Sequence, residues 1–194
     1  MATPTTSATS STARVPLEHP GSTLARVMNY WTRRSYGAEM EPMLALLHNR
    51  KVMTSVARFE MSLAKWSRLD RDLKELASLA VASQIGCSWC MDFGYYVSRT
   101  NGMEVAKLEQ VADWRSSTVY TPLERRVLEY AEAMTATPPT VTDEMVEGLR
   151  TDLDDAQLVE LTATISAENL YSRTNSALGL TSQGFKSQCD LTPR

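Results

Sequence analysis

The sequence has few cysteines, no excess of basic charge and no long apolar run. It contains 194 residues, with three cysteines and a net charge of −3. Without a basic excess the chain has no general attraction for nucleic acid or an anionic membrane surface, so we expect neither as a partner. The longest uncharged stretch, from Leu76 to Met91, has 16 residues and includes several polar ones. It is too short and too polar to span a bilayer, so no membrane protein is predicted.

The cysteines are too few for a disulfide framework, and no charged and then apolar export signal opens the chain. Both observations favour the reducing cytoplasm as the compartment. In that compartment a Cys-x-x-Cys motif is typical of redox chemistry or metal binding.

The chain divides by composition into three segments. Residues 1–13 contain only Ala, Thr, Ser and Pro after the first Met, and the first charge is Arg14. Such a segment has nothing with which to bury a core, so we expect a disordered leader over residues 1–20. It lacks the repeated Arg of a mitochondrial presequence. We expect a helical domain over residues 21–182 and a polar tail over residues 183–194.

The local signals along the domain are those of helices. Thr121, Pro122 and Glu124 form a predicted capping box, and apolar residues then recur at helical spacing until Pro138. Asp154 and Gln157 predict a second capping box. No alternating run rich in Val, Ile and Thr indicates a strand. We therefore predict an all-α fold, a single-domain bundle of seven to nine helices.

The motif Cys87-Ser88-Trp89-Cys90 follows Gly86, which interrupts an apolar helical run. If Gly86 ends one helix and Cys87 opens the next, both sulfurs lie in the first turn of a helix. Unpaired N–H groups at a helix N-terminus lower the pKa of a thiol below its ordinary value of about 8.5. A thiolate there can attack a peroxide or a disulfide, and the second sulfur can resolve the product as a disulfide.

Two other interpretations of the cysteines remain open. Cys87 and Cys90 could be buried structural thiols, because cysteine packs as a small hydrophobe. A zinc site would need further ligands, and the remaining candidates Cys189, His48 and His19 show no metal-binding spacing. We therefore predict no metal.

A resemblance adds to this interpretation. Glu75 precedes the Cys87-x-x-Cys90 motif by 12 positions, and the helical segment ENLYSRTNSALG follows at residues 168–179. From about residue 30 to residue 180 the chain resembles the carboxymuconolactone decarboxylase family, in its alkylhydroperoxidase-D-like branch. The resemblance implies an all-helical bundle of that type, assembled as homo-trimers or hexamers, that uses the Cys-x-x-Cys motif for peroxidase or disulfide reductase chemistry.

The resemblance also implies roles for individual residues. Cys90 would be the peroxide-attacking thiolate, Cys87 its resolving partner, and Glu75 the far end of a proton relay. Glu75 would lie about 18 Å from Cys87 along a continuous helix, so such a relay needs the chain to double back. Position within a helix start alone would favour Cys87 as the more exposed and more reactive sulfur.

The sequence departs from the family pattern at two relay positions. Trp89 and Gly94 stand where the family carries histidines, and neither can take up a proton in the required way. This departure predicts weak peroxidase activity. Asp92 is a candidate substitute base, although an acid in a helix first turn is also structurally favourable. Trp89, Asn169 and Arg173 are the other candidate accessory residues. Asn169 and Arg173 share a helix face that could bind a carboxylate substrate or form a subunit contact.

The leading hypothesis is a thiol-dependent oxidoreductase that reduces hydroperoxides through a Cys87–Cys90 disulfide without a cofactor. Its reducing equivalents would come from an external dithiol, which the resemblance suggests is a lipoyl group or a thioredoxin-like partner. One alternative is a cofactorless decarboxylase or isomerase of a lactone or ring acid. Another is a non-enzymatic oligomeric family member, an alternative that the missing histidines leave open.

Overall fold

The computed structural model describes residues 12–19 and 22–190. Within these ranges the chain forms α-helices joined by short links, with one 3-10 turn and no strand. The elements are α1 (Thr23–Tyr36), α2 (Glu41–Leu46), α3 (Arg50–Leu63), α4 (Arg71–Ile85), α5 (Ser88–Asn101), α6 (Val105–Gln110), η1 (Val111–Asp113), α7 (Pro122–Thr135), α8 (Asp143–Arg150), α9 (Asp155–Ala177) and α10 (Phe185–Asp190). The all-α prediction is confirmed.

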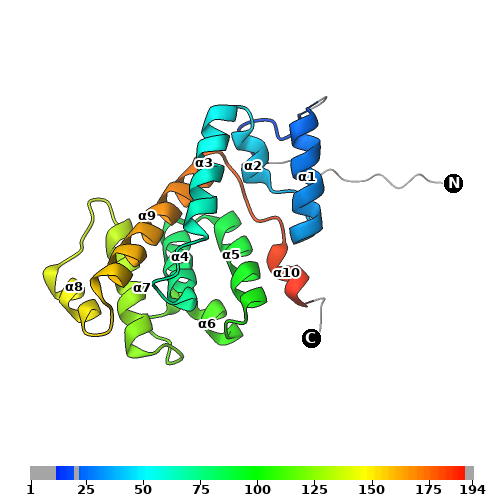
Figure 1. Cartoon of the computed structure of the whole chain (residues 1–194). Coiled ribbons are helices and arrows are strands. Elements are labelled where there is room, and N and C mark those ends of the chain that lie inside the picture. Colours follow the sequence, from blue (N-terminus) through cyan, green and yellow to red (C-terminus); the bar gives the residue numbers. More distant parts are fainter. Residues whose placement is uncertain (1–11, 20–21, 191–194) are drawn as a thin grey trace.

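Helix α4 lies at the centre of the bundle, with α5, α7 and α9 packed around it (Figure 1). Its side chains Leu76, Ala77 and Val81 are fully buried. A helix that is apolar on most of its circumference belongs in a core, because no face of it can be left in water. The composition of α4 therefore explains its central position.

The helix starts follow the predicted capping signals. Thr121 caps α7 in a capping box with Glu124, and Asp154 caps α9 in a second box with Gln157. The described residues contain ten α-helices, whereas seven to nine were expected. Helices α2, α6 and α10 have only six residues each, which is too short to show a clear apolar period in the sequence.

None of the helices described has both the length and the apolar character needed to cross a membrane.

Part of the predicted leader lies against the bundle. The backbone N–H of Arg14 donates to the carbonyl oxygen of Leu178 (2.8 Å), and its guanidinium donates to that of Ala177 (2.7 Å). Gly179 permits this approach, because a Cβ atom there would lie 2.5 Å from the carbonyl oxygen of Thr12. Low apolar content does not reveal such backbone contacts in advance. Residues 1–11 and 20 of the leader lie outside the described residues.

Residues 183–190 of the predicted polar tail also pack against the bundle. It contains α10, and Phe185 at the start of this helix is fully buried against the residues around the cysteines. Helix α10 packs on α5 (Figure 1). Phe185 therefore provides an apolar anchor for this helix beside the cysteine motif.

Candidate functional site

The cysteine motif lies at the turn between α4 and α5, as the sequence predicts. Gly86 ends α4 in the left-handed conformation, with φ of 77°, which a residue without a Cβ atom adopts freely. Cys87 is the N-cap of α5, and Cys90 is in the first turn of that helix. The backbone N–H of Cys90 donates to Sγ of Cys87 (3.2 Å). This turn places both sulfurs at the positive end of the helix dipole.

Cys87 and Cys90 are joined by a disulfide bond. Both residues are buried, with Cys87 1% exposed and Cys90 8% exposed, so Cys90 is the less buried of the two. A helix start alone favours the opposite order. Both cysteines belong to one buried cluster that also contains Ala82 of α4.

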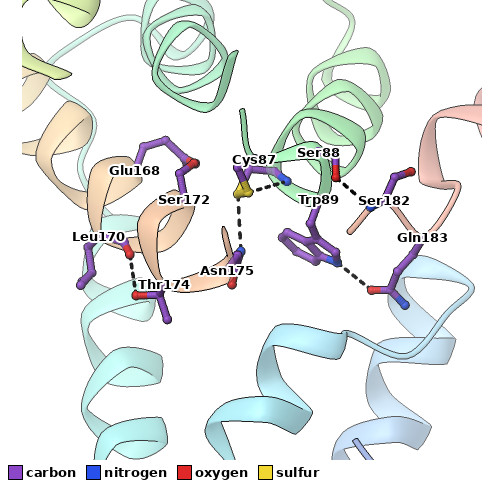
Figure 2. Close-up of a disulfide and its surroundings, with 11 residues drawn as sticks. Cys87, Ser88, Trp89, Glu168, Leu170, Ser172, Thr174, Asn175, Ser182 and Gln183 are labelled. Carbon is purple, nitrogen blue, oxygen red and sulfur yellow. Dashed lines mark hydrogen bonds between the residues drawn. A yellow bond between two sulfur atoms is a disulfide. The ribbon is translucent and has the colours of Figure 1, made fainter. Parts of the chain in front are cut away.

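Helix α9 supplies the polar side chains next to the disulfide (Figure 2). Nδ2 of Asn175, which is only 5% exposed, donates to Sγ of Cys90 (3.4 Å). The sequence analysis did not select Asn175 as a site residue. Its only signal was its place in the 168–179 segment that carries the family resemblance.

Ser172 and Glu168 lie on the same face of α9 as Asn175, about one and two turns earlier in the helix. The fully buried hydroxyl of Ser172 donates to Oε1 of Glu168 (2.6 Å). Burial raises the pKa of Glu168 to about 7; the Ser172 hydrogen bond opposes this shift and the negative charge of Glu60 adds to it. Glu168 is thus a carboxyl group that can exchange a proton near neutral pH.

The two candidate accessory residues on α5 bind the C-terminal segment. Trp89 donates from Nε1 to Oε1 of Gln183 (2.7 Å), as Figure 2 shows. Its ring also stacks on that of Phe93. The buried carboxylate of Asp92 accepts four backbone N–H groups from residues 183–186, at 2.7–3.0 Å. Both oxygens of Asp92 are therefore occupied in holding the start of α10.

Glu75 lies at the opposite end of α4 from the cysteines. Its Oε1 accepts from Nδ2 of Asn101 (2.5 Å), and Arg71 lies 3.9 Å away. Helix α4 is continuous from Arg71 to Ile85, so the ten positions from Glu75 to its last residue span about 15 Å. Among the described residues, no hydrogen bond or ion pair joins Glu75 to either sulfur.

The predicted face of Asn169 and Arg173 exists, and it binds the end of α7. Asn169 donates to Oγ1 of Thr135 (2.9 Å), and Arg173 donates to the carbonyl oxygen of the same residue (2.9 Å). Arg173 also donates to Oδ1 of Asn169 (3.3 Å). These contacts stabilise the packing of α9 on α7.

The remaining cysteine and both histidines lie outside the disulfide site. Cys189 is in α10, packed against the main core. His19 and His48 contact each other, with ring centroids 4.6 Å apart, and each binds a backbone carbonyl. Across the residues that the structure describes, no group of three or more His, Cys, Asp and Glu side chains could hold a metal ion.

The comparisons with known proteins agree with this geometry. The profile of the carboxymuconolactone decarboxylase family matches residues 50–133, a range that includes Glu75 and both cysteines of the motif. Over residues 50–133 the chain is therefore similar to this family.

One relative that is similar in sequence is the uncharacterized protein YnjA of Escherichia coli K12. It is 41% identical over 123 residues, which cover 62% of this chain and 66% of YnjA, just under two thirds of that relative.

Solved structures share the fold. A protein of unknown function from Agrobacterium tumefaciens, described as a candidate antioxidant defence protein AhpD, is 26% identical with a TM-score of 0.65, covering 69% of this chain and 91% of that one. The alkylhydroperoxidase AhpD core of a peroxidase-related protein from Ralstonia eutropha is 18% identical with a TM-score of 0.81, covering 94% and 98%. The second likeness shows the fold alone.

Proposed function

We propose that this protein is a thiol-dependent oxidoreductase that reduces hydroperoxides through its Cys87–Cys90 pair. The observation that carries the proposal is the disulfide at the N-terminus of α5, in which Cys90 is the less buried residue. A pair that closes a disulfide within one helical turn can pass reversibly between dithiol and disulfide. Cys90 is assigned as the peroxide-attacking residue because the family resemblance gives it this role and it is the less buried residue of the pair.

The first step oxidises Cys90. Its thiolate attacks the terminal oxygen of the hydroperoxide, so that an S–O bond forms as the O–O bond breaks. The sulfur loses two electrons and becomes a sulfenic acid. The alkoxide that leaves takes up the proton that the thiol released, and the product is an alcohol.

The second step closes the disulfide, and the third opens it again. The Cys87 thiolate attacks the Cys90 sulfur, and the hydroxide that leaves takes up the proton of Cys87 as water. An external dithiol, a lipoyl group or a thioredoxin-like partner, then attacks Cys90 and releases Cys87 as a thiolate. The second thiol of the donor completes the exchange, which leaves the donor oxidised and both cysteines reduced. A reducing cytoplasm is the compartment that supplies such donors.

Proton transfer limits the rate of this reaction. A positioned acid–base group commonly contributes 10²–10⁴-fold to a rate. Both histidines of the chain contact each other instead of the cysteines. We therefore expect slow turnover.

The protein also acts as a homo-oligomer, a trimer or a hexamer. Helix α1 exposes Val27, Tyr30 and Trp31, of which Tyr30 is 76% exposed. Helix α3 exposes Val52, Phe59 and Met61. Apolar strips of this kind are typical of surfaces that a second copy of the chain covers.

Thiol titration tests the proposed function. The reduced protein is treated with one equivalent of a small hydroperoxide, its thiols are counted before and after, and the new bond is mapped by mass spectrometry. We expect the loss of two thiols and a Cys87–Cys90 disulfide, with Cys189 still reduced. Replacing Cys189 by Ser should leave peroxide consumption intact. An unchanged thiol count, or a need for Cys189, would overturn the proposal.

A further inference from the structure

Each sulfur of the disulfide receives one N–H donor. Sγ of Cys87 accepts from the backbone N–H of Cys90 (3.2 Å), a contact that the start of any helix can provide. Sγ of Cys90 accepts from the side chain of Asn175 (3.4 Å), which comes from another helix 85 positions later in the chain. The second contact exists only because the tertiary fold brings α9 to α5.

The position of Asn175 is fixed by its surroundings. Its side chain is buried, and its backbone carbonyl accepts from the N–H of Leu180 in the link that follows α9. The next polar side chain on the same face is Ser172, whose hydroxyl donates a hydrogen bond to Glu168. Figure 2 shows Asn175 pointing at the disulfide, with Ser172 and Glu168 further along α9.

We propose that Asn175 is a catalytic residue of this site, which stabilises the Cys90 thiolate by hydrogen-bond donation from its side-chain amide. The catalytic meaning of this inference rests on the proposed function. An amide N–H is a donor that cannot accept the thiol proton, so it favours the charged sulfur without acting as a base. The proton released by Cys90 passes to water and later reaches the alkoxide. Hydrogen bonds to a charged acceptor are about twice as strong as neutral ones, so the contact gains strength as the thiol ionises.

The charged groups on the packed elements have partners of their own. Glu168 on α9 binds Ser172, Asp92 on α5 binds the backbone of residues 183–186, and Lys186 on α10 lies over the ring of Tyr95. On α4 the acidic and basic side chains lie at the far end, where Lys74 pairs with Glu160. Glu60 on α3 acts on Glu168 and on the phenol of Tyr36 at the end of α1. In the contacts described, none of these charged groups binds Cys90, whereas the neutral side chain of Asn175 does.

This proposal also separates the two sulfurs by role. The donor to Cys87 lies within the motif itself, whereas the donor to Cys90 can be removed by one substitution in α9. Loss of the Asn175 amide therefore affects the attacking sulfur and leaves the helix start of α5 as it is.

The test measures the pKa of the Cys90 thiol without any peroxide. In a chain with Cys87→Ser and Cys189→Ser, Cys90 is the one remaining cysteine, and its ionisation is followed by the ultraviolet absorbance of the thiolate. Asn175→Ala should raise this pKa by about one unit, the usual effect of losing a charge-assisted hydrogen bond. Asn175→Asp should raise it further, because a negative charge then faces the sulfur.

A matched control and a second measurement keep the test decisive. Thr164→Val removes another buried polar group of α9, whose hydroxyl binds only its own helix in the contacts described, and it should leave the pKa unchanged. In the unsubstituted Asn175 background, the side-chain amide resonance of Asn175 should shift with the midpoint of the Cys90 titration. An unchanged pKa in a folded Asn175→Ala protein, or an amide resonance that ignores the titration, would overturn the assignment. Because no substrate is used, a protein without peroxidase activity would refute the proposed function and leave this result standing.

Discussion

Gly94 lies directly against Leu79, so that a Cβ atom built on Gly94 would be 2.9 Å from Cδ2 of Leu79. Leu79 is 2% exposed and is part of the main core. Gly94 is the position at which the family resemblance expects a histidine. Close packing of α4 on α5 therefore occupies the space that a side chain at position 94 would need. A histidine there would have a higher helix propensity than glycine, but it would also overpack the core.

The first prediction follows from this contact. Gly94→His should lower the free energy of unfolding by roughly 1–3 kcal/mol, the usual cost of overpacking a core. The same substitution in a Leu79→Ala background should cost less, because the truncated side chain leaves room. Urea unfolding of the four proteins in this cycle measures the coupling. Equal costs of Gly94→His in both backgrounds would contradict the described contact.

The second prediction concerns Glu168 and pH. Burial raises the pKa of Glu168 from 4.5 to about 7 in the folded protein. Its contribution to stability is therefore fully present below pH 4.5 and is lost as the pH rises through 7, a change of about 3 kcal/mol. Glu168→Gln cannot ionise and should not show this loss. Urea unfolding at several pH values gives the difference between the two proteins, and parallel curves would show that Glu168 is not coupled to folding.

The third prediction concerns the contact between Asp92 and α10. Asp92→Ala removes the acceptor of four backbone N–H groups. We expect the C-terminal segment to detach, with tryptic cleavage after Lys186 at least several-fold faster than in the parent protein. Asp155→Ala is the matched control, because the Asp155 side chain is 79% exposed at the start of α9. Equal cleavage rates in both variants would mean that Asp92 does not hold α10.

The residues that could be predicted from the sequence are those whose signals are local. Gly86 and Cys87 define the turn between two helices by their own conformational preferences, and the Thr121 and Asp154 caps work within four residues. The contact between Asn175 and Cys90 depends on how α9 packs on α5. No periodic pattern in either helix contains that information.

The C-terminal helix shows the same limit. Residues 183–190 are mostly polar, and their order depends on Phe185 and on the distant carboxylate of Asp92. Likewise, only the packing of α4 against α5 shows why Gly94 is a glycine. Glu75 matches the family spacing, yet its side chain binds Asn101 at the other end of α4.

The fourth prediction concerns assembly. Sedimentation of the full chain at micromolar concentration should give a trimer or a hexamer. Trp31→Glu places a charge in the exposed apolar strip of α1 and should shift the protein towards the monomer. Val159→Glu, at a 67% exposed position of α9, is the control and should not. A parent protein that sediments as a strict monomer would remove the claim.

The central claim is that Cys90 attacks the peroxide and Cys87 resolves the product. The most direct measurement is peroxide consumption by the reduced Cys87→Ser and Cys90→Ser proteins, with sulfenic acid trapped by a dimedone probe. We predict that Cys87→Ser consumes one equivalent and stops with the probe on Cys90, whereas Cys90→Ser reacts no faster than a simple thiol in solution. Consumption by Cys90→Ser at the rate of the parent protein, with the probe on Cys87, would contradict the claim.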